Sequence, residues 1–207
     1  MNEQLLKMNG LSVEILDALS FESHLGIPLK NNLHYFDKDL LIAELVAMTE
    51  WLDEQEILSG IALDYRVKSL DSILLKYDRY YPDHQTRKVF NDILGFRAFC
   101  DSYAQILEEE SVQFRIADMS SGKAVDDGYR GVHVYYQKSG KYYPIEIQFN
   151  TLFDRQLNNW LHDYLYKKDY PIETGRILRE KYESGLIRNE HEFKEVLNNV
   201  LSGSERS

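Results

Sequence analysis

The sequence predicts an α+β fold in which one mixed β-sheet is flanked by helices. Two segments, 129–136 and 143–151, alternate residue types with a period of two, as strands with one buried face do. In the first segment Val132, Val134 and Tyr136 share one face of the strand. Tyr129, His133 and Tyr135 share the other face. In the second segment apolar residues alternate with Glu146, Gln148 and Asn150. A histidine, an aromatic ring and a carboxylate are therefore expected on one side of the sheet.

The remaining elements follow from apolar spacing and from chain breakers. Apolar residues at three-and-four spacing indicate the helices, and glycine and proline mark their ends. One helix is expected to begin just after Lys68, with Ser69 as its N-cap. The other expected elements are strands at 91–100 and 112–119, a helix at 1–20 interrupted at Gly10, a loop at 21–33, and helices at 36–60, 86–90, 102–110, 152–168, 176–184 and 190–201.

The composition predicts a globular chain with a substantial core. Its 207 residues fit one domain, or one domain with helical extensions, and 43% of them are hydrophobic. No apolar run reaches the ~18 residues of a membrane span, and no secretory signal opens the chain. We therefore expect a cytoplasmic protein without a membrane partner. The single cysteine, Cys100, has no internal disulfide partner and is expected in the core.

The polar residues between 66 and 146 form a set suited to phosphate chemistry. Positive charge and a helix N-terminus, which attract a polyphosphate, come from Arg66, Lys68, Ser69 and Lys76. Asp92 and Glu146 supply oxygen ligands of the kind that Mg²⁺ takes. Taken singly, Asp92 is typical of a turn residue, and the helix after Lys68 of a solvated surface helix. The sequence lacks a Gly-x-x-x-x-Gly-Lys-Ser/Thr loop and the kinase motifs, which excludes P-loop NTPases and protein kinases.

Six motifs carry a resemblance to a known family. They are Arg66-x-Lys68-Ser69, Ser72-Ile73-x-x-Lys76, Asp92-Ile93-x-Gly95-x-Arg97, Gly128-Tyr129-Arg130-x-x-His133, Glu146-Ile147-Gln148-x-x-Thr151 and His162-x-x-x-Tyr166-Lys167. The same motifs stand in the same order in the RelA/SpoT-type synthetase domain, which the chain resembles over about residues 60–170. It looks like a stand-alone small alarmone synthetase: one domain over 1–207, with helical extensions at 1–59 and 171–202.

The resemblance implies a nucleotidyltransferase-like sheet and transfer of the β,γ-pyrophosphate of ATP to a ribose 3′-hydroxyl, with Mg²⁺. The residues it implies for ATP are Arg66, Lys68, Ser69, Lys76, Arg97 and Gln148. Asp92 and Glu146 would hold Mg²⁺, and Glu146 would also take the proton from the attacking hydroxyl. Tyr129 would stack on the acceptor base, and His133 would orient the ribose or the phosphates. Catalysis would then rest on positioning and charge neutralisation.

Departures from the family pattern concern the acceptor. Synthetases of (p)ppGpp carry basic residues before the Gly-Tyr pair and an arginine after Glu-Ile-Gln, where this chain has Asp126, Asp127 and Asn150. Two acids facing a nucleotide diphosphate would repel it by ~1 kcal/mol per charge, with only Lys123 to oppose them. This pattern resembles the toxic small alarmone synthetases, several of which pyrophosphorylate the 3′-CCA end of tRNA.

Three functions follow, in this order. The first is a tRNA pyrophosphokinase that blocks aminoacylation and translation, the toxin of a pair with a protein antitoxin. The second is a (p)ppGpp synthetase that uses GDP or GTP, and the third is a catalytically inactive nucleotide-binding or regulatory module. The formal net charge of −10 argues against broad nucleic-acid binding, so a tRNA binder needs a local basic patch. Its candidates are Lys30, which we assign to acceptor binding, and Lys38, Arg79, Arg87 and Lys88.

Overall fold

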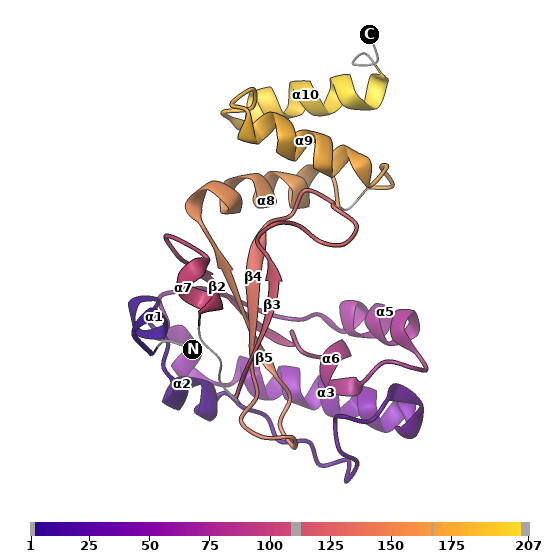
Figure 1. Cartoon of the computed structure of the whole chain (residues 1–207). Coiled ribbons are helices and arrows are strands. Elements are labelled where there is room, and N and C mark those ends of the chain that lie inside the picture. The colour runs from indigo at the N-terminus through magenta and orange to yellow at the C-terminus, as the bar shows by residue number, and fades with distance from the viewer. Residues whose placement is uncertain (1–2, 109–112, 167, 204–207) are drawn as a thin grey trace. The chain divides into compact units, whose positions relative to one another are not determined.

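The computed structural model describes residues 3–108, 113–166 and 168–203 of the chain (Figure 1). Its contacts divide the chain into two compact units, each described here by itself. The first unit comprises 1–98, 104–117 and 133–149, and the second comprises 99–103, 118–132 and 150–207. The expectation of a single domain stays a prediction.

The helices of the first unit begin and end close to the predicted breakers. They are α1 (Glu3–Met8), α2 (Val13–Ala18), the 3-10 turn η1 (Leu33–Tyr35), α3 (Lys38–Asp53), α4 (Glu56–Ser59), α5 (Leu70–Tyr80), α6 (Thr86–Val89) and α7 (Ala104–Leu107). Asp37 caps α3 by accepting a hydrogen bond from the backbone N–H of Leu40. The helix expected at 36–60 is in fact two helices, because α3 ends at Asp53 and α4 starts after Gln55.

The five strands form one mixed sheet in the order β1-β2-β5-β4-β3. They are β1 (Asp64–Val67), β2 (Leu94–Phe99), β3 (Phe114–Met119), β4 (Gly131–Tyr136) and β5 (Ile145–Asn150). β1 runs antiparallel to β2, with Asp64 opposite Arg97 and Arg66 opposite Gly95. β2 runs parallel to β5, since Gly95 neighbours Glu146 and the N–H of Cys100 bonds to the carbonyl of Asn150. The fold is therefore α+β with a mixed sheet, as predicted, although strand β1 was not foreseen.

One face of the sheet is apolar and closed. Its side chains have no solvent exposure: Leu94, Phe96, Ala98, Val132, Val134, Tyr136, Ile145, Ile147 and Phe149. This is the apolar face that the period-two alternation predicts. Cys100 is buried, as expected, and burial raises the pKa of its thiol to about 11. The residues of opposite parity therefore occupy the other face, which is polar.

The second unit contains three helices that pack on one another. They are α8 (Leu152–Tyr164), α9 (Glu173–Glu183) and α10 (Glu190–Ser202), and Thr151 caps α8. Leu157, Leu161, Leu178 and Phe193 belong to their common apolar core and have no solvent exposure. The helix expected at 176–184 begins earlier, at Glu173, so Gly175 lies in the first turn of α9 rather than before it. Among the helices described, none combines the length and the apolar character needed to cross a bilayer.

Candidate functional site

Asp92, just before β2, is held between two lysines. The Nζ of Lys68, which follows β1, lies 2.7 Å from one carboxylate oxygen of Asp92. The Nζ of Lys76, on α5, lies 2.9 Å from the other and also donates a hydrogen bond to the carbonyl of Val89. Lys68 is buried, so this ion pair supplies the partner that a cation shielded from water needs. Three predicted site residues are thereby brought together.

Three further predicted ATP residues, Ser69, Arg66 and Arg97, have other neighbours. Ser69 stands at the N-cap of α5, but its hydroxyl contacts Ser72 rather than a backbone N–H. Residues opposite each other in an antiparallel pair point to the same face, so Arg66 and Arg97 share a face with Gly95. The Arg97 guanidinium lies 3.8 Å from the carboxylate of Asp64, a partner that the motifs did not indicate.

Glu146 on β5 is the centre of a second cluster. Its Oε1 lies 3.0 Å from Nδ1 of His133 on the adjacent strand β4. Its Oε2 accepts a hydrogen bond of 2.7 Å from the amide of Gln148. The hydroxyl of Tyr135 lies 3.4 Å from the same His133 nitrogen and also hydrogen-bonds to Glu146. The histidine, aromatic ring and carboxylate predicted for one face of the sheet do converge.

These contacts set the protonation of Glu146. Burial by itself would raise the pKa of its carboxyl, but the hydrogen bonds from His133, Gln148 and Tyr135 and the His133 charge outweigh burial and hold the pKa below its usual range. The carboxylate is therefore ionised at neutral pH. Burial and the charge of Glu146 raise the pKa of Tyr135, so its hydroxyl stays protonated and can donate.

The donor set fits a Mg²⁺ ion that arrives with nucleotide phosphates. Mg²⁺ usually takes one or two carboxylates and leaves the other positions to substrate oxygens and water. The charge of Asp92 also raises the pKa of Tyr135, so both carboxylates act on the same side chain. Among the residues that the structure describes, no group of three or more His, Cys, Asp or Glu side chains could form a complete metal site.

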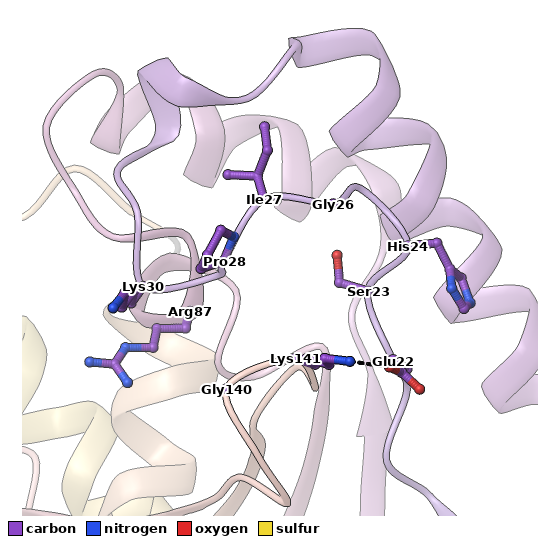
Figure 2. A pocket seen from close by; sticks show the side chains of 10 residues that line it. All are labelled: Glu22, Ser23, His24, Gly26, Ile27, Pro28, Lys30, Arg87, Gly140 and Lys141. Carbon is purple, nitrogen blue, oxygen red and sulfur yellow. Dashed lines mark ion pairs between the residues drawn. The ribbon is translucent and has the colours of Figure 1, made fainter.

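Lys30 lines a pocket of about 520 Å³ together with Arg87 (Figure 2). Arg87 also lines a second pocket, of about 140 Å³, with Lys88, Arg115 and Tyr135. Arg115 lies over the ring of Tyr135, 4.1 Å from its centroid. The cations that line the two pockets, Lys30, Arg87, Lys88 and Arg115, are here called the basic track. The second pocket is also lined by Tyr135, which contacts His133 and Glu146. By contrast, the candidate Lys38 is already ion-paired to Asp78 at 3.0 Å.

Tyr129 belongs to the second unit, where the acids that precede it are paired. Arg130 binds both oxygens of Asp126, at 2.8 and 2.9 Å. Lys123 lies 2.5 Å from Asp127, which also accepts the backbone N–H of Tyr129. The expectation that only Lys123 opposes the two acids is therefore wrong: each carboxylate has its own cation, and the repulsion of a nucleotide diphosphate largely disappears.

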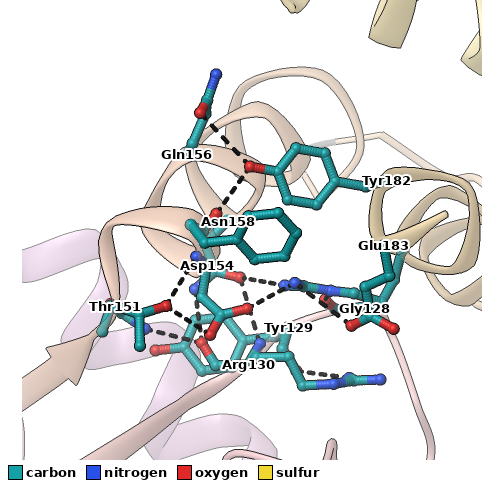
Figure 3. A network of polar contacts seen from close by, with 12 residues as sticks. Gly128, Tyr129, Arg130, Thr151, Asp154, Gln156, Asn158, Tyr182 and Glu183 are labelled. Carbon is teal, nitrogen blue, oxygen red and sulfur yellow. Dashed lines mark hydrogen bonds and ion pairs between the residues drawn. The ribbon is translucent and has the colours of Figure 1, made fainter. Parts of the chain in front are cut away.

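The backbone on both sides of Tyr129 is held by α8 and α9 (Figure 3). The buried Arg179 of α9 donates to the carbonyl of Gly128 at 2.8 Å and to Asp154 at 2.6 Å. The side chain of Asn158 accepts the N–H of Arg130 and donates to its carbonyl at 2.7 Å. Asn150 donates to the same carbonyl at 2.8 Å and is buried, so it does not replace an arginine at a phosphate.

Sequence reasoning missed several of these residues, although some signals were present. The pairing of Asp126 with Arg130 had no such signal, because the spacing of four brings side chains together on a helix and this segment is a loop. Arg179 falls on the otherwise apolar face of α9, between Leu178 and Tyr182, which hints at a buried charge. Nothing in the sequence indicated that Tyr135 and Arg115 stack. Lys167 of the last motif lies outside the described residues.

Fold and site together define an α+β protein with clustered charged side chains on and beside one mixed sheet. Residues 65–170, about half of the chain, match the family described as "Region found in RelA / SpoT proteins". The chain belongs to this RelA/SpoT family. No curated protein sequence matches it.

Solved structures with a similar fold include two proteins of Bacillus subtilis and one of Streptococcus pneumoniae. Small alarmone synthetase 1, bound to its product pppGpp, is 23% identical, with a TM-score of 0.43, over 81% of this chain and 90% of that one. Small alarmone synthetase 2 is 21% identical, with a TM-score of 0.43, over 83% and 100%. A GTP pyrophosphokinase family protein of S. pneumoniae is 22% identical, with a TM-score of 0.39, over 80% and 90%.

Proposed function

We propose that this chain transfers the β,γ-pyrophosphate of ATP to the 3′-hydroxyl of the terminal adenosine of tRNA. The hydroxyl oxygen attacks the β-phosphorus of ATP, the bond from that phosphorus to the oxygen bridging to the α-phosphate breaks, and AMP leaves. The proton of the attacking hydroxyl passes to Glu146, which is ionised because its hydrogen bonds lower its pKa. A tRNA modified in this way would not be aminoacylated, which makes the protein a toxin of translation with an antitoxin partner.

The cluster around Asp92 supports the ATP end of this reaction. Lys68, Lys76 and the start of α5 place positive charge where the triphosphate would lie, with Ser69, Arg66 and Arg97 beside them. Asp92 and Glu146 would hold Mg²⁺, which when bound neutralises charge on the transferred pyrophosphate and polarises its oxygens. His133 and Gln148 fix both oxygens of Glu146, so the base is oriented before the substrate arrives.

The basic track is the observation that carries the tRNA acceptor. Three cations chosen from the sequence, Lys30, Arg87 and Lys88, line two pockets that share Arg87. The second pocket reaches Tyr135, which hydrogen-bonds to the proposed base. A polynucleotide has a phosphate for each of several such cations, whereas a mononucleotide engages one cluster. This local charge offsets the net charge of −10 where an acceptor strand would approach.

The loop before Tyr129 is consistent with an acceptor that lacks a 5′ polyphosphate. Its two cations, Lys123 and Arg130, are engaged by Asp127 and Asp126, so the four side chains together carry no excess positive charge. A terminal adenosine needs none, and Tyr129 could stack on its base. The same pairing also favours the second candidate, because acids that are neutralised no longer repel GDP or GTP. A guanosine nucleotide therefore remains the alternative acceptor.

One assay separates the candidates. The protein is incubated with γ-labelled ATP and Mg²⁺ and with deacylated tRNA, tRNA lacking its terminal adenosine, GDP or GTP. We expect label on intact tRNA only, and no label when Glu146→Gln is used, although that variant should fold normally. Label on guanosine nucleotides alone would replace the tRNA proposal by the alternative. Transfer to no acceptor would point to the inactive module.

The basic track is tested with a matched pair of variants. Arg87→Ala should raise the KM for tRNA by roughly tenfold, the loss of one or two charge-assisted contacts, and leave the KM for ATP unchanged. Lys38→Ala removes the same charge from a residue that is already paired with Asp78, and should leave both constants unchanged. Equal effects of the two variants would mean that only net charge matters.

A further inference from the structure

The segment Asp126–Gly131, which carries Tyr129, is held against α9 by two glycines. A Cβ on Gly128 would lie 2.3 Å from the carbonyl oxygen of Gly175, and one on Gly175 would lie 1.9 Å from that of Asp127. Neither contact is possible with a side chain, so the two backbones touch. Gly128 also has a φ of +86°, which L residues rarely adopt.

Arg179 lies one helical turn after Gly175 and binds the same segment. Its side chain is 1% exposed, donates three of the hydrogen bonds found among the described residues, and lies 3.8 Å from the carboxylate of Glu183. The Nε atom donates to the carbonyl of Gly128 at 2.8 Å, and the two terminal nitrogens donate to Asp154 at 2.6 Å and to Asn158 at 3.2 Å. Residues four apart share a helix face, so Gly175 and Arg179 lie on the same face of α9. That face contacts the Tyr129 segment, through the backbone at Gly175 and through the guanidinium at Arg179.

The peptide units on either side of Tyr129 are therefore fixed from two helices. On the N-terminal side, Arg179 holds the carbonyl of Gly128. On the C-terminal side, Asn158 of α8 binds both the N–H and the carbonyl of Arg130, and Arg179 binds the Asn158 oxygen in turn. These two peptide planes fix the backbone of Tyr129 and the direction of its Cα–Cβ bond, and the Nζ of Lys123 lies 5.1 Å from the centroid of its ring. Arg179 contacts Gly128 directly and reaches Arg130 through Asn158.

Burial of a guanidinium is a costly way to gain stability alone. An ion pair such as Arg179 with Asp154 recovers little more than its own desolvation, and apolar residues of similar volume often serve stability as well or better. A methionine or leucine would also complete the apolar face that Leu178 and Tyr182 share with α8 and α10. Only a planar fork of donors reaches a carbonyl, a carboxylate and an amide oxygen at once. The presence of arginine at position 179 thus indicates that the segment Asp126–Gly131 must keep one backbone conformation.

We infer that Arg179 is a positioning residue for acceptor recognition: from α9 it fixes the backbone of Gly128–Arg130 and so the direction of the Cα–Cβ bond that carries the Tyr129 ring. This inference rests on the proposed function only in its assumption that Tyr129 stacks on the acceptor base. Arg179 itself touches no substrate. Its loss should impair acceptor binding and leave ATP binding as it is, because the proposed ATP residues belong to the first unit.

The test compares Arg179→Lys with Leu178→Ala. The lysine keeps the charge but loses the fork, and so loses the contacts to Gly128 and Asn158. Leu178→Ala removes a fully buried side chain from the same helix without touching the Tyr129 segment, so it reproduces a general loss of stability. Asn158→Ala, which releases Arg130 from α8, serves as a second variant and replaces Arg179→Lys should that protein not fold.

Two measurements are made on each full-length variant. Hydrogen exchange follows the amides of residues 128–130, which bond to Asp126, Asp127 and Asn158. Steady-state kinetics give the KM for ATP and for whichever acceptor takes the label. For Arg179→Lys and Asn158→Ala we expect faster exchange at these amides and an acceptor KM raised between about tenfold and about a hundredfold, with an unchanged KM for ATP. For Leu178→Ala we expect a lower melting temperature with neither effect.

The outcomes separate the inference from the function it rests on. Unchanged exchange at 128–130 in both Arg179→Lys and Asn158→Ala, or an equal change in Leu178→Ala, would overturn the positioning role. Faster exchange with an unchanged acceptor KM would overturn the link to the acceptor, and Tyr129→Ala then shows which part is wrong. If Tyr129→Ala also leaves the acceptor KM unchanged, the proposed role of Tyr129 fails; if it raises that KM, only the role of Arg179 in recognition fails. If Arg179 acts on the acceptor through Tyr129, adding Arg179→Lys to Tyr129→Ala should not raise the acceptor KM any further.

Discussion

His133 and Glu146 stand on adjacent strands, with Nδ1 of the imidazole 3.0 Å from Oε1 of the carboxylate. Both side chains are largely buried. Burial opposes the charge on Glu146 and the hydrogen bond from His133 favours it, and the balance leaves the pKa of the carboxyl below its usual range. The proposed general base is thus kept ionised by a neighbour rather than by solvent.

Replacing His133 should shift the pH dependence of the reaction. In His133→Asn the largest opposing contribution is gone, so burial raises the pKa of Glu146. The acidic limb of kcat/KM, which reports the base that must be ionised, should move to higher pH than in the wild type. Profiles from about pH 4 to pH 8 measure this shift against the usual glutamate value of about 4.3. His191→Asn, at an exposed histidine of α10, is the control, and a limb that stays in place in His133→Asn would show that Glu146 is not the titrating base.

Removing the carboxylate of Asp92 should affect both folding and transfer. Asp92→Asn leaves the buried ammonium of Lys68 without its anion, a loss we expect to lower the free energy of unfolding by about 1–3 kcal/mol. Transfer should fall by more than this destabilisation explains, because the same carboxylate is a proposed Mg²⁺ ligand. Urea unfolding and initial rates at several Mg²⁺ concentrations measure the two effects. A variant that is less stable but fully active would make Asp92 purely structural, with Lys38→Ala as the control for an exposed ion pair.

The strands and the larger helices could be predicted because each carries its own periodic pattern. The alternation in 143–151 gives the buried face of β5 and the polar position of Glu146 directly. Strand β1 has only four residues, three of them exposed, so it lacks an alternating pattern, and its place depends on the register with β2. The break between α3 and α4 was also missed, because no glycine or proline stands at Glu54 and Gln55.

The side chains of the candidate site were easier to choose than to pair. The motifs named Lys68, Lys76 and Asp92, but not that one carboxylate accepts both lysines. Asp126 and Asp127 appeared as two repelling acids because charge counting ignores geometry, and Arg130 was missed as a partner. The contacts of Arg179 depend on a turn of α9 meeting a loop some fifty residues earlier, and no local pattern encodes such a meeting.

The pair Asp126–Arg130 should make stability depend on pH in acid. The hydrogen bond from Arg130 is the largest of the contributions that lower the pKa of Asp126 in the folded chain. A carboxyl with a lowered folded pKa binds protons more readily when unfolded, so it stabilises the fold above its unfolded value of about 3.9. That contribution is lost as the pH falls through the lower, folded pKa.

Asp126→Asn removes this pH-dependent contribution. Urea midpoints of the wild type and of Asp126→Asn should therefore differ most near pH 7 and converge as the pH falls below about 4. Asp163→Asn, at an exposed acid beside His162, provides the background for losing one surface carboxylate. A difference that stays constant from pH 7 to pH 3 would mean that the ion pair does not form in solution.

The contact between Gly128 and Gly175 predicts that neither position accepts a side chain. In Gly175→Ala the new Cβ would lie 1.9 Å from the carbonyl oxygen of Asp127, and in Gly128→Ala it would lie 2.3 Å from that of Gly175. Because backbone cannot move aside as a flexible side chain can, we expect each change to lower the free energy of unfolding by about 2–4 kcal/mol. Gly185 has a positive φ like Gly128, but nothing lies within 4 Å of its Cβ position. Gly185→Ala should therefore lose only about 1 kcal/mol of unfolding free energy, from backbone strain alone.

Gly140→Ala controls for Gly175→Ala, because neither position has a positive φ and Gly140 has nothing within 4 Å. Chemical unfolding of the four variants separates strain from overlap: the difference between Gly128→Ala and Gly185→Ala is the cost of the contact with α9. Equal losses at Gly128 and Gly185 would mean that the loop and α9 do not touch in solution. In that case the proposed positioning of the Tyr129 segment by Arg179 would also fail, because Arg179 reaches the carbonyl of Gly128 only if the two backbones are in contact.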